Sequence, residues 1–132
     1  MAKRDMLMGI LEDMGYKPQI DQDGDLLIRH EMKSIYVIVG DEDDLRVVLL
    51  LPQFVEVEED EIVLVLTACN NVTREIKMAK VFLERSLKAV SASCEFYYTD
   101  EDVIRLNLSH ALTILGMVRS IFRNTKAELA GN

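Results

Sequence analysis

Clusters of carboxylates, two histidines and two cysteines are the side chains of this 132-residue chain that could carry chemistry. Asp21, Asp23 and Asp25 surround Gly24, which suggests a calcium loop. An EF-hand needs its glycine at the sixth position and a glutamate at the twelfth, and no counting frame here supplies both. Because an Asp-Gly dipeptide tolerates positive φ, a tight hairpin turn is the preferred interpretation.

The other titratable groups also favour a structural role. Residues 58–61 are four consecutive acids at the expected start of a helix, where carboxylates stabilise the helix dipole. The spacing of His30 and His110 supports no metal site. Cys69 and Cys94 fall on apolar faces and are expected to be core thiols. The glycines are scattered singly, so there is no phosphate loop. We therefore predict no catalytic residue, no metal and no cofactor.

Asn70, Asn71 and Arg74 are the polar residues whose role is most open. They follow an apolar helical segment and could present amides and a guanidinium to a peptide or an anion. Alternatively, the asparagines end the helix, where Asn tolerates the left-handed conformation, and Arg74 offsets nearby acids. The second interpretation is preferred.

Composition restricts the partners of the chain. A formal charge of −8 disfavours nucleic acid and anionic membrane surfaces, because phosphates are met by clustered Lys and Arg. The longest apolar runs, residues 47–51 and 62–66, are too short to span a bilayer, and the charged N-terminal stretch is no signal peptide. Two cysteines give no disulfide framework. We expect one domain, residues 1–132, in the cytoplasm.

Apolar periodicity predicts a first helix over residues 5–14, ended by Gly15 and Pro18. Short strands follow, over residues 19–22, 25–30, 34–39 and 45–51. Pro52 should end the last of them, because proline cannot donate to a central ladder.

Helical spacing returns over residues 58–72 and gives way to strands over residues 77–84 and 90–98. The second of these strands alternates, which predicts one buried and one solvated face. The last helix should be capped by Thr99 and run to about Phe122. The order helix, strands, helix, two strands, helix indicates an α+β domain with an antiparallel sheet packed against helices.

The last helix carries more apolar surface than one sheet normally covers. The excess is deep core, a homodimer seam, or a groove for an amphipathic segment of another protein. The residues that we predict to bind a partner are Leu112, Met117, Ile121 and Phe122.

Residues 69–83, together with the order of elements, resemble the YbjN family of small bacterial proteins. The pattern there is Cys-Asn at 69–70, Arg-Glu at 74–75, and a strand containing Ala79, Val81 and Phe82. The family's opening is matched by Leu11, Gly15, Tyr16 and Asp-Gly-Asp at 23–25. The acidic residues 56–61 and the lack of Trp depart from the pattern. The resemblance implies a fold like that of type III secretion chaperones, which are small, acidic and commonly dimeric; the family is labelled a sensory transduction regulator.

These observations favour a non-catalytic cytoplasmic module, chaperone-like or regulatory, that binds another polypeptide and forms a homodimer. The alternative, from another class, is a small-ligand sensor or enzyme with a pocket between sheet and helices. In that case Asn71, Arg74 and Tyr97 should converge on the pocket.

Overall fold

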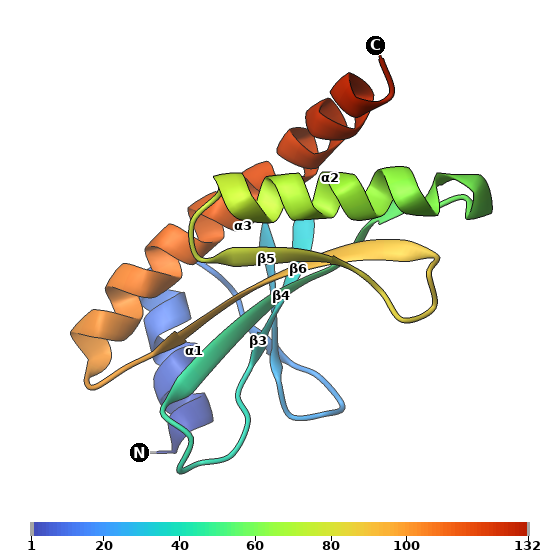
Figure 1. Ribbon diagram of the computed structural model, residues 1–132. Coiled ribbons are helices and arrows are strands. Elements are labelled where there is room, and N and C mark those ends of the chain that lie inside the picture. Colours follow the sequence, from blue (N-terminus) through green and yellow to red (C-terminus); the bar gives the residue numbers. More distant parts are fainter. Residues whose placement is uncertain (1, 132) are drawn as a thin grey trace.

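The computed structural model describes residues 2–131, which form an antiparallel sheet with helices on one side (Figure 1). The helices are α1 Lys3–Asp13, α2 Ile62–Glu75 and α3 Glu101–Leu129, and a short 3-10 turn, η1 Glu59–Glu61, precedes α2. The strands are β1 Gln19–Ile20, β2 Leu26–His30, β3 Lys33–Ile38, β4 Arg46–Glu56, β5 Ala79–Leu83 and β6 Ala89–Tyr97. The α+β class and the predicted order of elements are confirmed.

The strands lie in the order β1-β2-β3-β4-β6-β5, and every neighbouring pair is antiparallel. The pairing of β4 with β6 is the longest, running from Arg46 opposite Tyr97 to Glu56 opposite Ala89. The sheet twists strongly, so that β3 crosses the direction of β5 in Figure 1. The short β1 and the strand β5 form the two edges of the sheet.

One face of the sheet is buried against all the helices of residues 2–131. The strands contribute fully buried Val37, Leu49 and Cys94 to this core. The helices contribute Leu7 and Leu11 from α1, Val65 from α2, and Leu108, Leu115 and Phe122 from α3. Since successive strand residues point to opposite faces, the residues between these core positions face away from the helices.

The predicted end of β4 at Pro52 is wrong, because the strand continues through a bulge. The register with β6 shifts between Leu51 and Val55, and Gln53 adopts φ 47°. The Gln53 N–H donates to Ser91 Oγ at 2.8 Å. The bulge takes Pro52 out of the regular ladder, so its missing donor breaks no pairing.

Helix α3 differs from the prediction at both ends. Its N-cap is Asp100 rather than Thr99, and the Asp100 carboxylate accepts the Val103 N–H at 3.0 Å. The helix runs to Leu129 instead of Phe122, since no Gly or Pro lies between Phe122 and Gly131. The additional turns extend past α2 in Figure 1.

The end of α2 is also later than predicted. The helix continues through Asn70 and Asn71 to Glu75, so the asparagines do not end it. Arg74 lies in the last turn, where a cation stabilises the helix dipole.

The hairpin turn predicted at residues 21–25 is confirmed. Gly24 has φ 84°, a conformation that costs glycine little. The Asp21 carboxylate accepts the N–H groups of Asp23 and Asp25 at 2.8 and 3.0 Å, which fixes the turn between β1 and β2.

Candidate functional site

The face of the sheet that points away from the helices carries a cluster of apolar side chains. We call it the open-face patch: Leu27, Tyr36, Ile38, Val48, Leu50 and Phe82. All six are half-buried, and none packs against the core that residues 2–131 form. Partly exposed apolar side chains gathered on one face of a sheet form a candidate contact surface for another molecule.

The register of the strands makes the patch continuous from β2 to β4, and Phe82 lies beyond β6, opposite Ser91. Leu27 lies opposite Tyr36, Tyr36 opposite Leu50, and Ile38 opposite Val48. Side chains directly opposite each other on one face of an antiparallel pair are in contact. The row that contains Leu50 continues to Ser93 on β6 and Lys80 on β5. A ligand lying across the strands would therefore meet apolar groups first, then a hydroxyl and then an ammonium group.

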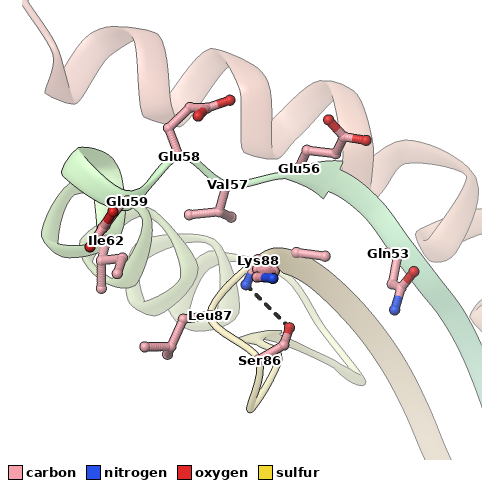
Figure 2. A pocket seen from close by; sticks show the side chains of 10 residues that line it. Gln53, Glu56, Val57, Glu58, Glu59, Ile62, Ser86, Leu87 and Lys88 are labelled. Atoms are coloured by element: carbon pink, nitrogen blue, oxygen red, sulfur yellow. Dashed lines mark hydrogen bonds between the residues drawn. The ribbon is translucent and has the colours of Figure 1, made fainter.

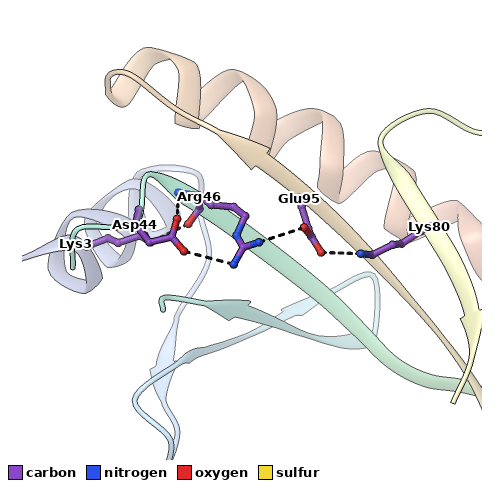
Figure 3. Close-up of polar contacts among 5 residues, drawn as sticks. All are labelled: Lys3, Asp44, Arg46, Lys80 and Glu95. Atoms are coloured by element: carbon purple, nitrogen blue, oxygen red, sulfur yellow. Dashed lines mark hydrogen bonds and ion pairs between the residues drawn. The ribbon is translucent and has the colours of Figure 1, made fainter. Parts of the chain in front are cut away.

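A row of ion pairs borders the patch. Lys80 Nζ lies 2.9 Å from Glu95 Oε1, and Arg46 joins the same carboxylate at 3.9 Å and Asp44 at 3.5 Å. Figure 3 shows these four residues following one another across β5, β6 and the start of β4. Exposed pairs such as these contribute little to stability, so their charges can exchange for those of a partner.

Two buried serines on β6 lie between the part of the patch on β2 to β4 and the strand β5. Ser91 is satisfied, since it accepts the Gln53 N–H and donates to the Glu84 carboxylate. Ser93 is 5% exposed, and its Oγ has no hydrogen-bond partner within residues 2–131. The predicted solvated face of β6 is therefore wrong over the stretch that contains the serines, which are buried. Short side chains sink between longer neighbours such as Leu50 and Lys80.

The outer edge of β5 is closed by Thr73 of α2. The Thr73 hydroxyl accepts the Val81 N–H at 2.9 Å and donates to the Val81 carbonyl at 3.2 Å. An unpaired strand edge would otherwise be a template for another strand. A partner therefore meets the open face more readily than this part of the edge.

The residues predicted on α3 to bind a partner fall into two groups. Leu112 and Phe122 are 2% and 0% exposed and lie in the core. Met117 is 48% exposed and Ile121 is half-buried, so these two are the members of the set that solvent reaches. Leu106, which is 60% exposed, adds apolar surface to the same helix.

The structure does not bring Asn71, Arg74 and Tyr97 together, as the small-ligand alternative required. Tyr97 is next to the core residue Phe96 and lies opposite Arg46, so it belongs to the open face, where it is 73% exposed. The other two lie on α2, which packs on the opposite face of the sheet. Asn70 and Arg74 are both exposed on α2, one helical turn apart.

A surface cavity of about 890 Å³ lies at the other end of β4, between the start of α2 and the β5–β6 turn. Its apolar lining includes Val57, Ile62 and Leu87. Figure 2 shows Val57 pointing toward the side where Leu87 lies, whereas Glu56 and Glu58 point to the opposite side. The lining combines this apolar surface with polar residues, among them Glu59, Ser86 and Lys88.

The histidines and cysteines form no reactive site. Tyr16 Oη and His30 Nδ1 lie 2.7 Å apart, and burial followed by the charge of Glu31 raises the pKa of Tyr16. This cluster ties the end of α1 to β2. Both cysteines are buried and reduced, as predicted. Within residues 2–131, no three His, Cys, Asp or Glu side chains are placed to hold a metal ion.

The antiparallel sheet is covered by helices on one face and carries a half-buried apolar patch on the other, an arrangement that suits a binding module. The chain belongs to the family described as type III secretion (YopN, CesT) and YbjN peptide-binding chaperone 1, which matches residues 2–132. The resemblance drawn from residues 69–83 is thereby confirmed. Within the described part, residues 2–131, no helix is long and apolar enough to cross a membrane.

Two solved structures share the fold. YbjN from E. coli, described as a candidate transcription regulator, is 10% identical and superimposes with a TM-score of 0.68 over 94% of this chain and 91% of its own. An uncharacterized protein from Methanothermobacter thermautotrophicus is 11% identical, with a TM-score of 0.52 over 97% and 94% of the two chains. No curated protein sequence matches the chain.

Proposed function

We propose that this chain is a non-catalytic cytoplasmic protein that holds a segment of another polypeptide against the open-face patch. The observation that carries the proposal is the continuous apolar row from Leu27 through Tyr36 to Leu50 on a sheet face that the core does not use. The peptide-binding description of its family supports a polypeptide as the occupant.

The geometry favours an extended segment with apolar residues on one side. Such a segment would cover the half-buried patch, and each apolar group removed from water adds roughly 25 cal/mol per Å² of binding free energy. The bordering charges of Lys80, Glu95 and Arg46 would set its direction. A net charge of −8 keeps the loaded and empty protein soluble and disfavours acidic clients.

We also propose that the chain forms a homodimer through the outer side of α3, where Met117 and Leu106 are exposed. Introducing a charge there should separate the subunits without unfolding them. The Met117→Asp variant is expected to elute as a folded monomer in size-exclusion chromatography with light scattering. A dimer of unchanged mass would exclude the outer side of α3 as the dimer interface.

The peptide site is tested with a ligand selected on the wild-type chain from a random dodecapeptide library. Leu50→Asp should weaken the Kd of the synthetic peptide about 10- to 100-fold, because a carboxylate in the patch would have to be desolvated. Fluorescence anisotropy gives the Kd, and circular dichroism confirms that the variant is folded.

Val63→Asp is the matched control. Val63 is 78% exposed on the first turn of α2, where an added carboxylate is tolerated by the helix dipole. This variant should bind with the wild-type Kd. Val48→Thr is a milder patch variant, which is expected to weaken binding about 3-fold. It replaces Leu50→Asp in the binding test if Leu50→Asp does not fold. Wild-type affinity in the folded patch variant contradicts the proposal.

A further inference from the structure

We infer that Ser93 is the polar anchor of the open face, donating a hydrogen bond from its hydroxyl to a main-chain carbonyl of the bound polypeptide. The inference rests on the proposed function, since it names the group through which that site holds its ligand. A main-chain carbonyl is present in every peptide, so such an anchor would serve clients of differing sequence.

The position of Ser93 within the sheet supports this role. It lies directly opposite Leu50 of the patch on one side and Lys80 on the other. Its side chain points to the open face, because its neighbours Ala92 and Cys94 are core residues. A small surface pocket of about 230 Å³ is lined by Ser93, Lys80, Glu95, Met78 and Ala79.

The Ser93 hydroxyl is not paired with any protein group of residues 2–131. The residue is 5% exposed and its Oγ lacks a partner among residues 2–131. A buried polar group without a hydrogen bond costs free energy. A ligand carbonyl that reached it would remove this cost, so the stabilisation would appear on binding.

Access to Ser93 depends on Lys80. The Lys80 side chain is 59% exposed and pairs with Glu95, two residues from Ser93 on the same strand face. An exposed pair is held by little free energy, so the long lysine side chain can move aside when a ligand arrives. The Lys80–Glu95 pair then lies at the margin of the occupied site.

Ser91 supplies a matched comparison on the same strand and face. It is also buried, but its hydroxyl accepts the Gln53 N–H and donates to Glu84. A serine that only stabilises the fold should behave like Ser91 on substitution. A serine that hydrogen-bonds a ligand should instead affect binding without lowering stability on substitution.

The experiment compares Ser93→Ala with Ser91→Ala, using the peptide selected on the wild-type chain. Ser93→Ala should weaken the peptide Kd about 3- to 10-fold and leave the melting temperature unchanged or higher. Ser91→Ala should lower the melting temperature by about 3–8 °C and keep the wild-type Kd. Calorimetry and anisotropy at a temperature well below both transitions give these values.

A thioamide scan of the same peptide locates the acceptor. Replacing one carbonyl oxygen by sulfur should weaken binding to the wild-type chain at a single position, and that loss should vanish in Ser93→Ala. The inference is overturned if Ser93→Ala binds with the wild-type Kd, or if it is destabilised as Ser91→Ala is. If the peptide binds Leu50→Asp with the wild-type Kd, the open-face patch is not the peptide site, and the proposed function fails rather than the role of Ser93 alone.

Discussion

At the scale of single residues, the buried cysteines give the chain a specific dependence on pH. Burial raises the pKa of Cys69 to about 11 and that of Cys94 to about 12, from an ordinary value of 9.0. At pH 9 the thiols of the unfolded chain are half ionised, and well below pH 9 both are protonated whether the chain is folded or unfolded. Above it the unfolded chain loses protons that the folded chain retains, so stability falls as the pH rises toward 11–12.

We therefore expect the free energy of unfolding to be about 1–3 kcal/mol lower at pH 10 than at pH 8. Cys94→Ala should remove roughly half of this decrease, although the substitution lowers stability at both pH values. Urea titrations of the wild-type chain and the variant at the two pH values measure the decrease in each. A decrease of the same size in the variant would assign the effect to other groups.

Residues whose role depends on tertiary contacts were the hardest to anticipate. Lys3 is 3% exposed and donates to the carbonyls of Asp44 and Arg46 at 2.7 and 2.8 Å, with a pKa lowered chiefly by burial. Lysine is rarely buried, and its partners lie some forty positions away, so nothing in its local sequence indicates the contact. Cys69 and Cys94 were predictable, because their neighbours are apolar at the right period.

At the scale of elements, Thr73 connects α2 to the edge strand β5. Replacing it with the isosteric valine removes both hydrogen bonds to Val81. We expect Thr73→Val to lower the free energy of unfolding by about 1–3 kcal/mol and to increase self-association through the uncovered edge. Urea unfolding and static light scattering measure the two effects.

Thr67 is the control on the same helix. It is exposed, and its hydroxyl donates to the Val63 carbonyl of its own helix at 2.9 Å. Thr67→Val should change stability by no more than about 0.5 kcal/mol and leave association unaltered. Equal effects of the two substitutions would show that Thr73 does not close the edge.

The elements themselves followed from periodicity, but their ends did not. The type of each helix and strand was predictable because apolar positions recur at helical or alternating spacing. The bulge after Leu51 was not, since it depends on pairing with Ser91 across the sheet. The end of α2 was not predictable either. The helix continues past the asparagines because Thr73, two residues after Asn71, contacts β5.

At the scale of the whole molecule, the open face could have been found from two runs of consecutive apolar residues. Residues 47–51 and 35–38 lack polar alternation, and a strand of this kind is apolar on both faces. We predicted the excess apolar surface on the last helix instead. Much of that helix faces both the sheet and α2, which explains why Leu112 and Phe122 are core residues.

The family and the α+β class were predictable because both depend on the order of elements and on residues 69–83. The location of the proposed binding site was not predictable, because it depends on which face of the sheet the helices cover. Both α1 and α3 pack on the same side, where Leu7 and Leu11 of α1 share one core with Leu108 and Leu115 of α3.

The most direct test of the peptide site is a methyl NMR titration of the wild-type chain with the selected dodecapeptide. Labelled Ile, Leu and Val methyl groups report on both faces of the molecule. The proposal predicts that the largest shifts occur at Leu27, Ile38, Val48 and Leu50, with Leu106 and Val63 unchanged. Shifts confined to Leu106, Ile114 and Ile121 on α3 would contradict it and place the polypeptide on the helix.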